Sequence, residues 1–132
     1  MAKATNILDF PNLEPWEKEF NRCKPWIEKA LKYQDNYLID DIKENIREGL
    51  FHLWPADKSF VITEFVIFPQ NKAMNILFCG GDFKELEKML PYLEKFAKTA
   101  GCKRMYGGGR KGWLRKLKHL GFLPEYLIRK EL

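Results

Sequence analysis

The sequence has few cysteines and histidines and no long apolar run. Its three cysteines form no CxxC pair and its two histidines stand far apart, so neither a disulfide framework nor a metal site is predicted. We expect the thiols to be reduced and to pack in the core. No apolar stretch approaches the ~18 residues of a membrane helix, and residues 1–6 lack the apolar core of a signal peptide. These absences favour a soluble, cytoplasmic protein without a metal and without membrane contact.

What the chain does have is the composition of one folded domain. Of its 132 residues, 45% are hydrophobic and 31% are charged, with 9 glycines and 7 prolines, which excludes collagen and low-complexity disorder. Residues 1–13 show little hydrophobic periodicity. We therefore expect a flexible N-terminal arm over residues 1–13 and a single domain over residues 14–132.

The net charge of +5 is unevenly distributed. The segment from Lys103 to Lys118 contains many cations and no acidic residue. A basic surface of this kind attracts anions such as nucleic acid, a phosphate or an acidic protein. The alternative is an ordinary solvated helix face. If nucleic acid binds there, its affinity falls steeply as the salt concentration rises.

Hydrophobic spacing predicts three helical pieces before the first strand. The first begins at Pro15, where a missing N–H costs nothing, and Pro25 is expected to bend the chain and start a second piece. A third helix is expected over residues 40–48, with Gly49 as its left-handed stop. The apolar stripes of these helices are interpreted as core.

After Gly49 the hydrophobic period changes from helical to alternating. The sequence predicts strands over residues 50–54, 60–68 and 73–79, a helix over 83–100 that Pro91 kinks or restarts, a strand over 102–106, a short basic helix after residues 107–109, and a terminal strand over 126–132. This order gives an α+β fold with a mixed sheet, in which an antiparallel meander precedes a strand-helix-strand-helix-strand half.

The C-terminal half carries a family resemblance. Residues 113–122, Trp-Leu-Arg-Lys-Leu-Lys-His-Leu-Gly-Phe, resemble the last helix and the Gly-Phe strand start of the GNAT superfamily of N-acyltransferases. Over residues 38–132 the chain is similar to small phage and prophage proteins that are GNAT-like, on Trp54-Pro55, residues 60–68, Gly80-Gly81-Asp82, Gly101-Cys102 and residues 109–113. The resemblance implies a phage protein, located in the cytoplasm of a bacterial host or in the virion.

The resemblance also implies a place for acetyl-CoA. GNAT enzymes hold it between two splayed strands, with its pyrophosphate on backbone N–H groups where the next helix begins. The corresponding contacts here are Cys79, Gly80, Gly81, Lys84, Arg110 and Lys111. However, the family pattern at this turn, Gln or Arg, two residues, Gly, one residue, then Gly or Ala, is absent. Asp82 would repel a phosphate, and we expect it to cap the helix instead.

Candidate catalytic groups are few. The Tyr that protonates the leaving thiolate in many family members corresponds to Leu117, which has no proton to donate. Glu64 is the candidate base, because it alternates with apolar residues and burial raises the pKa of a carboxyl toward neutrality; alternatively, it lies on a sheet edge or pairs with a Lys or Arg. Tyr106 is a second candidate for proton transfer, and His119 is expected at a helix end.

Two functions therefore compete. The first is a phage-related GNAT-fold protein with a degenerate acyl-CoA motif, non-enzymatic or weakly active, which binds a phage structural protein or a host protein and is associated with the virion. The alternative is an acetyl-CoA-dependent N-acyltransferase that acts on an unidentified amine. Either protein can be an oligomer.

Overall fold

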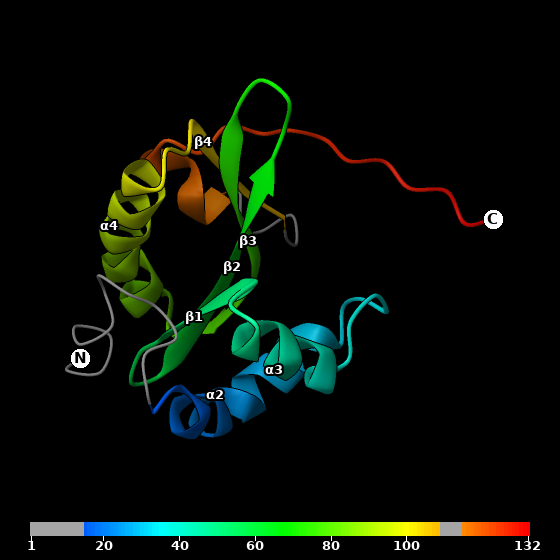
Figure 1. Ribbon diagram of the computed structural model, residues 1–132, viewed down its shortest axis with the longest axis vertical. Coiled ribbons are helices and arrows are strands. Elements are labelled where there is room, and N and C mark those ends of the chain that lie inside the picture. Colours follow the sequence, from blue (N-terminus) through cyan, green and yellow to red (C-terminus); the bar gives the residue numbers. More distant parts are fainter. Residues whose placement is uncertain (1–14, 109–114) are drawn as a thin grey trace.

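A four-stranded sheet lies at the centre of the computed structural model, which describes residues 15–108 and 115–132 (Figure 1). Its strands are β1 (Phe51–Pro55), β2 (Ser59–Ile67), β3 (Lys72–Gly81) and β4 (Arg104–Gly107), in that order across the sheet. The first three strands form an antiparallel meander, and β4 pairs with β3 in parallel. The sheet is therefore mixed, as the sequence predicts.

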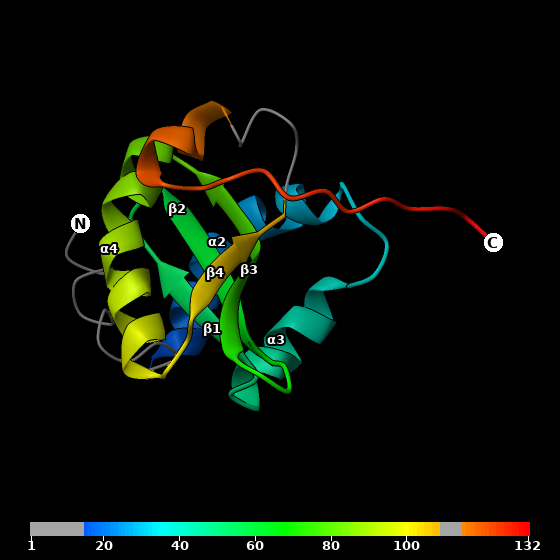
Figure 2. The same ribbon diagram turned by 90° about the horizontal axis from the view of Figure 1, so that it is seen from above.

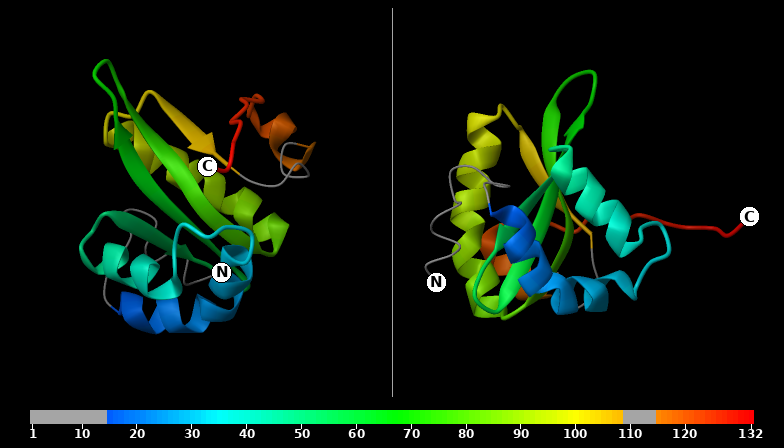
Figure 3. Two further views of the ribbon diagram at one scale, coloured as in Figure 1. Left: turned by 90° about the vertical axis from the view of Figure 1, so that its right-hand side faces the viewer. Right: turned by 60° about the horizontal axis from the view of Figure 1, so that its bottom comes forward.

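Helices cover both faces of this sheet. They are α2 (Trp16–Leu31), α3 (Ile39–Arg47), α4 (Phe83–Thr99) and the short 3-10 turn η1 (Lys118–Leu120). The pair α2 and α3 packs on one face and α4 packs on the other (Figures 1 and 3). Among the described residues no helix is long and apolar enough to cross a membrane.

Each face of the sheet has its own apolar core. The alternation of side chains along β2 sends Phe60 and Ile62 toward α2 and α3, and Val61 toward α4. On the α4 side, Trp54 and Leu93 are almost fully buried. Full burial of each such side chain contributes roughly 1.5–3 kcal/mol to folding, so the two cores fix how the helices lie against the strands.

Two interior prolines leave their helices unbroken, which corrects the expectation of two separate pieces at Pro25 and rules out a restart of the helix at Pro91. Helix α2 continues through Pro25, and α4 continues through Pro91. Pro25 and Asn21, whose carbonyl loses its helical N–H partner, are both exposed, so water can replace the missing donor. Because Phe20 and Ile27 are buried on either side of the proline, packing favours one continuous helix.

The terminal strand expected over residues 126–132 does not form. These residues are extended, but they pair with no strand in the described part of the chain, and they run away from the rest of the fold (Figures 1 and 2). Alternating apolar residues favour an extended backbone, whereas a strand also needs a neighbouring edge with which to form hydrogen bonds.

Candidate functional site

Strand β4 pairs with only the first part of β3, because β4 ends at Gly107. The two strands pair only from Ala73 opposite Arg104 to Ile76 opposite Gly107. The next residue, Leu77, is the extra residue of a β-bulge against β2, and a bulge bends its strand and increases the local twist. Beyond Ile76, β3 pairs only with β2 among the described residues.

A row of polar side chains crosses the sheet near the end of β4. Glu64 on β2 faces Asn75 on β3, which in turn faces Tyr106 on β4, so all three project from one face of the sheet. The Asn75 side-chain amide donates to a Glu64 carboxylate oxygen at 2.9 Å. The structure thus brings the two predicted catalytic candidates, Glu64 and Tyr106, into one row.

The structure contradicts one of the two alternatives for Glu64, its place at a sheet edge. Strand β2 lies inside the sheet rather than at its edge, and the partner that the described residues give the half-buried carboxylate is the neutral amide of Asn75. Sequence reasoning missed Asn75, which could be found only from the register of β2 against β3. At the other end of the row, Arg104 donates a long 3.4 Å hydrogen bond to the Tyr106 hydroxyl.

Aromatic side chains form a wall next to this row. Phe51 is the β1 neighbour of Glu64, and the Tyr37 ring meets the rings of Phe51 and Phe78 edge-on at centroid distances of 5.8 and 5.9 Å. The Gln34 side chain fixes the connection between α2 and α3 that carries Tyr37, because it bonds both the N–H and the carbonyl of Tyr37. Tyr37 was another residue that sequence reasoning did not identify.

The start of α4, where the resemblance places a pyrophosphate, is occupied by groups of the protein itself. The Asp82 carboxylate accepts from the Lys84 N–H at 2.9 Å, which confirms Asp82 as the helix cap. The Asp82 N–H donates to the Lys58 carbonyl at 3.0 Å. A phosphate at a helix start needs free N–H groups and no competing carboxylate. At this turn the N–H groups of Asp82 and Lys84 already donate to groups of the protein, and the Asp82 carboxylate lies beside them.

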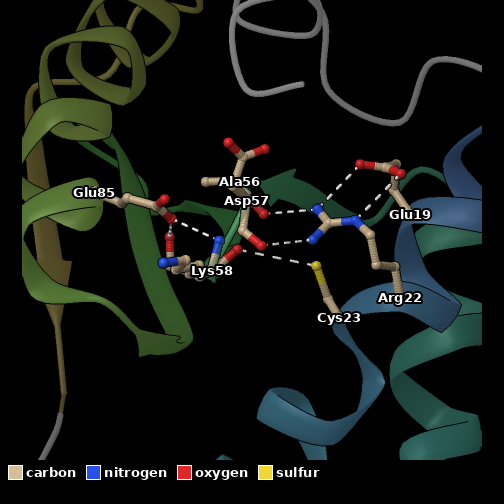
Figure 4. Close-up of polar contacts among 8 residues, drawn as sticks. Glu19, Arg22, Cys23, Ala56, Asp57, Lys58 and Glu85 are labelled. Atoms are coloured by element: carbon tan, nitrogen blue, oxygen red, sulfur yellow. Dashed lines mark hydrogen bonds and ion pairs between the residues drawn. The ribbon is translucent and has the colours of Figure 1, made fainter. Parts of the chain in front are cut away.

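A second carboxylate, that of Glu85 on α4, binds the turn between β1 and β2. One oxygen of Glu85 accepts from the Lys58 N–H at 2.9 Å and from the Ser59 hydroxyl at 2.7 Å. From the opposite side, Arg22 on α2 donates to the carbonyls of Ala56 at 2.6 Å and Asp57 at 2.9 Å (Figure 4). The turn between β1 and β2 is thus held between α2 and α4. The described residues at the start of α4 do not fit a pyrophosphate.

The other predicted cofactor contacts offer little for an anion. Burial raises the pKa of Cys79 to about 11, so its thiol stays neutral. A side chain at Gly80 would press on the Phe60 ring, 3.1 Å away. Lys84 is exposed. Arg110 and Lys111 lie outside the described residues, as do residues 1–14.

Two residues singled out from the sequence, Leu117 and His119, lie in the C-terminal helical segment. Leu117 stands where the resemblance places a proton donor and is half-buried. His119 lies in η1, with its Nε2 atom 2.8 Å from a Glu87 carboxylate oxygen on α4, so it docks the segment onto that helix. None of the three cysteines forms a disulfide, and no group of three potential metal ligands occurs within residues 15–108 and 115–132.

No protein-family model and no curated sequence matches this chain. Its fold is similar to several solved structures. A Trypanosoma brucei acetyltransferase superimposes with a TM-score of 0.65 at 11% identity, covering 88% of this chain and 94% of the other. A mutant of the Thermus thermophilus protein TTHA1254 gives 0.61 at 16% identity, covering 86% and 91%. An integron cassette protein from V. cholerae gives 0.59 at 13% identity, covering 86% of each chain. The chain therefore has a mixed α+β, GNAT-like fold.

Proposed function

We propose that this GNAT-fold protein acts by binding a macromolecular partner and does not transfer acyl groups from acetyl-CoA. The observation that carries the proposal is the start of α4, where Asp82 caps the helix and Lys58 takes the neighbouring N–H. In a GNAT-like fold this is where the pyrophosphate of the donor would be held. The side chain at Leu117 adds to the argument, because an alkyl group cannot protonate a thiolate.

The proposed partner is a structural protein of a phage particle or a protein of its bacterial host, with this chain as a virion-associated component. Two surface features support a binding role. Ile67 and Phe68 are exposed beside the turn between β2 and β3, and exposed apolar groups that lie together are typical of interaction sites. The described cations of the basic segment, among them Lys103 and Arg115, are also exposed and would favour an anionic surface on the partner.

The second candidate is an N-acyltransferase, and the β-bulge in β3 just beyond its pairing with β4 favours it. The bulged residue, Leu77, follows the last residue of β3 that pairs with β4, close to the row of Glu64, Asn75 and Tyr106. In this alternative the Glu64 carboxylate takes a proton from an acceptor amine, and the Asn75 amide orients that carboxylate.

Calorimetric titration with acetyl-CoA and with free CoA distinguishes the two candidates. We expect no saturable binding to the parent protein up to about 1 mM, a concentration at which a site worth only 4 kcal/mol would be half filled. Circular dichroism of the same sample shows that it is folded. Saturable binding near micromolar with turnover of an amine would overturn the proposal and support the enzyme.

Two variants sharpen this experiment. Asp82→Ala removes the carboxylate at the start of α4 and should cost about 1 kcal/mol of stability as a lost cap, without creating a CoA site because the Lys58 carbonyl still holds the N–H of residue 82. Glu64→Gln keeps an oxygen that can accept from Asn75. If the parent binds acetyl-CoA and Glu64→Gln loses turnover but not binding, Glu64 is the base.

A further inference from the structure

The segment from Leu123 to Leu132 presents apolar side chains that its own fold does not cover. Tyr126, Leu127 and Ile128 are 88%, 97% and 91% exposed. Three successive large apolar residues in this state are unusual on a monomeric protein and mark an interaction site. Their backbone is already extended, which is the conformation needed to add to another strand.

The path of the segment directs it away from its own sheet. It passes β4 near its start, where the charge of Glu125 acts on Arg104. Beyond that point it runs outward from the fold, and its last residues lie far from the strands (Figures 1 and 2). No described strand of the same molecule accompanies this outer part, so the apolar residues are placed to meet another chain.

The sequence of the segment is self-complementary when two copies pair in antiparallel. In an antiparallel pair, facing side chains lie on the same side of the ribbon. When a two-fold axis relates two identical strands, one residue must therefore lie on the axis and face its own copy. With Leu127 in that position, the facing pairs are Tyr126 with the partner's Ile128 and Glu125 with the partner's Arg129. The first pair joins an aromatic to a β-branched side chain, and the second joins opposite charges.

The neighbouring symmetric registers are worse. If Ile128 faces its own copy, Glu125 faces the partner's Glu131, and like charges are then directly opposed. If residue 129 faces its own copy, two arginines meet. If Tyr126 faces its own copy, Glu125 faces the partner's Leu127 and Arg129 faces the partner's Leu123, so no opposite charges meet. The register centred on Leu127 therefore has the best match of charge and shape, and it repeats each favourable pair twice across the axis.

We propose that residues 123–132 pair in antiparallel with the same segment of a second copy of this chain, with Leu127 at the two-fold axis, and that this pairing makes a homodimer. This inference is independent of the proposed function. A ribbon of two strands is marginal by itself, so we expect a weak dimer whose population rises with concentration.

Sedimentation equilibrium of the full chain from about 10 μM to 1 mM tests the dimer. Hydrogen exchange at the high concentration should show protection of the amides of residues 123–132 that is lost on dilution. A protein that stays monomeric throughout overturns the proposal. So does a monomer in which these amides are protected, because the segment then pairs within its own molecule.

Charge reversal tests the register. Glu125→Arg places an arginine opposite the partner's Arg129 in both symmetric pairs and should weaken the dimer about tenfold or more. Lys130→Glu also reverses a charge in the same segment, but its facing residue is Pro124, so its effect should be much smaller; Glu131 is left unchanged because it pairs with Arg129 of its own chain at 2.7 Å. Combining Glu125→Arg with Arg129→Glu should restore the dimer. Equal dissociation constants for the two single variants contradict the register.

Discussion

Replacing Gly81 by alanine is expected to destabilise the fold by about 3 kcal/mol or more. Gly81 has a φ of 102°, and a Cβ atom there would lie 2.1 Å from the Lys58 carbonyl oxygen and 2.5 Å from the Ser59 Cα. Both are backbone atoms of the turn between β1 and β2. Because Arg22 and Glu85 hold this turn from opposite sides, it cannot move away cheaply. Urea unfolding at neutral pH measures the loss of stability.

Gly49→Ala is the matched control for this variant. Gly49 also has a positive φ, 78°, but a Cβ atom there would meet nothing within 4 Å. Its cost is that of the left-handed backbone alone, about 1–2 kcal/mol. If both alanine variants lose the same stability, the close contact between Gly81 and the turn has no energetic weight and the account of the start of α4 is wrong.

Acidification from pH 6.5 to pH 4 is expected to lower the free energy of unfolding by about 2 kcal/mol through His52 alone. Burial lowers the pKa of His52 from 6.5 to about 4, and the charge of Lys72 acts in the same direction. Between these pH values the unfolded chain binds a proton that the folded chain does not. This contribution to stability is therefore complete above pH 6.5 and is lost as the pH falls toward 4. The full difference in pKa corresponds to ~3 kcal/mol, which residual contact of the ring with water reduces.

The surroundings of His52 explain why the neutral ring is preferred. Its Nδ1 atom lies 3.0 Å from the Thr63 hydroxyl, which also accepts from the Trp54 indole N–H at 3.0 Å. The hydroxyl keeps its own proton to donate to a neutral Nδ1. The ring packs against Phe65 and Phe96 at centroid distances of 4.7 and 5.3 Å, where a charge has little water around it.

Chemical unfolding of the parent and of His52→Gln across pH 4 to pH 8 isolates this effect. Both proteins carry the same carboxylates, so acid titration of those groups cancels in the difference. The difference in unfolding free energy between the two proteins should shrink as the pH falls from 6.5 to 4. A difference that does not change with pH means that His52 is protonated in the folded protein as easily as in the unfolded chain.

Local patterns made most of the elements predictable. In β2 and in α4 the buried face is visible in the sequence, because apolar residues recur there with the spacing of a strand and of a helix. The predicted break at Pro25 was wrong because a residue-by-residue rule gives the cost of a missing hydrogen bond, whereas burial of Phe20 and Ile27 on either side of the proline favours a continuous helix. The terminal strand was misread because no local pattern says whether a partner edge is within reach.

The candidate site was predictable in part. Glu64 and Tyr106 were identified from residue type and strand position, but Asn75 and Tyr37 were not, because their place beside Glu64 depends on strand register and on the path between α2 and α3. Register and path are set by contacts between residues far apart in the chain, which no single stretch of sequence contains.

The sequence by itself determined the α+β order of elements, the cap at Asp82 and the need for glycine where another group approaches the chain at Gly80-Gly81. Only the tertiary structure decided what that group is. The close neighbour of Gly81 is the Lys58 carbonyl of the turn between β1 and β2, rather than a phosphate. A glycine permits close approach by any group, and which group arrives depends on the packing of α2 and α4 around that turn.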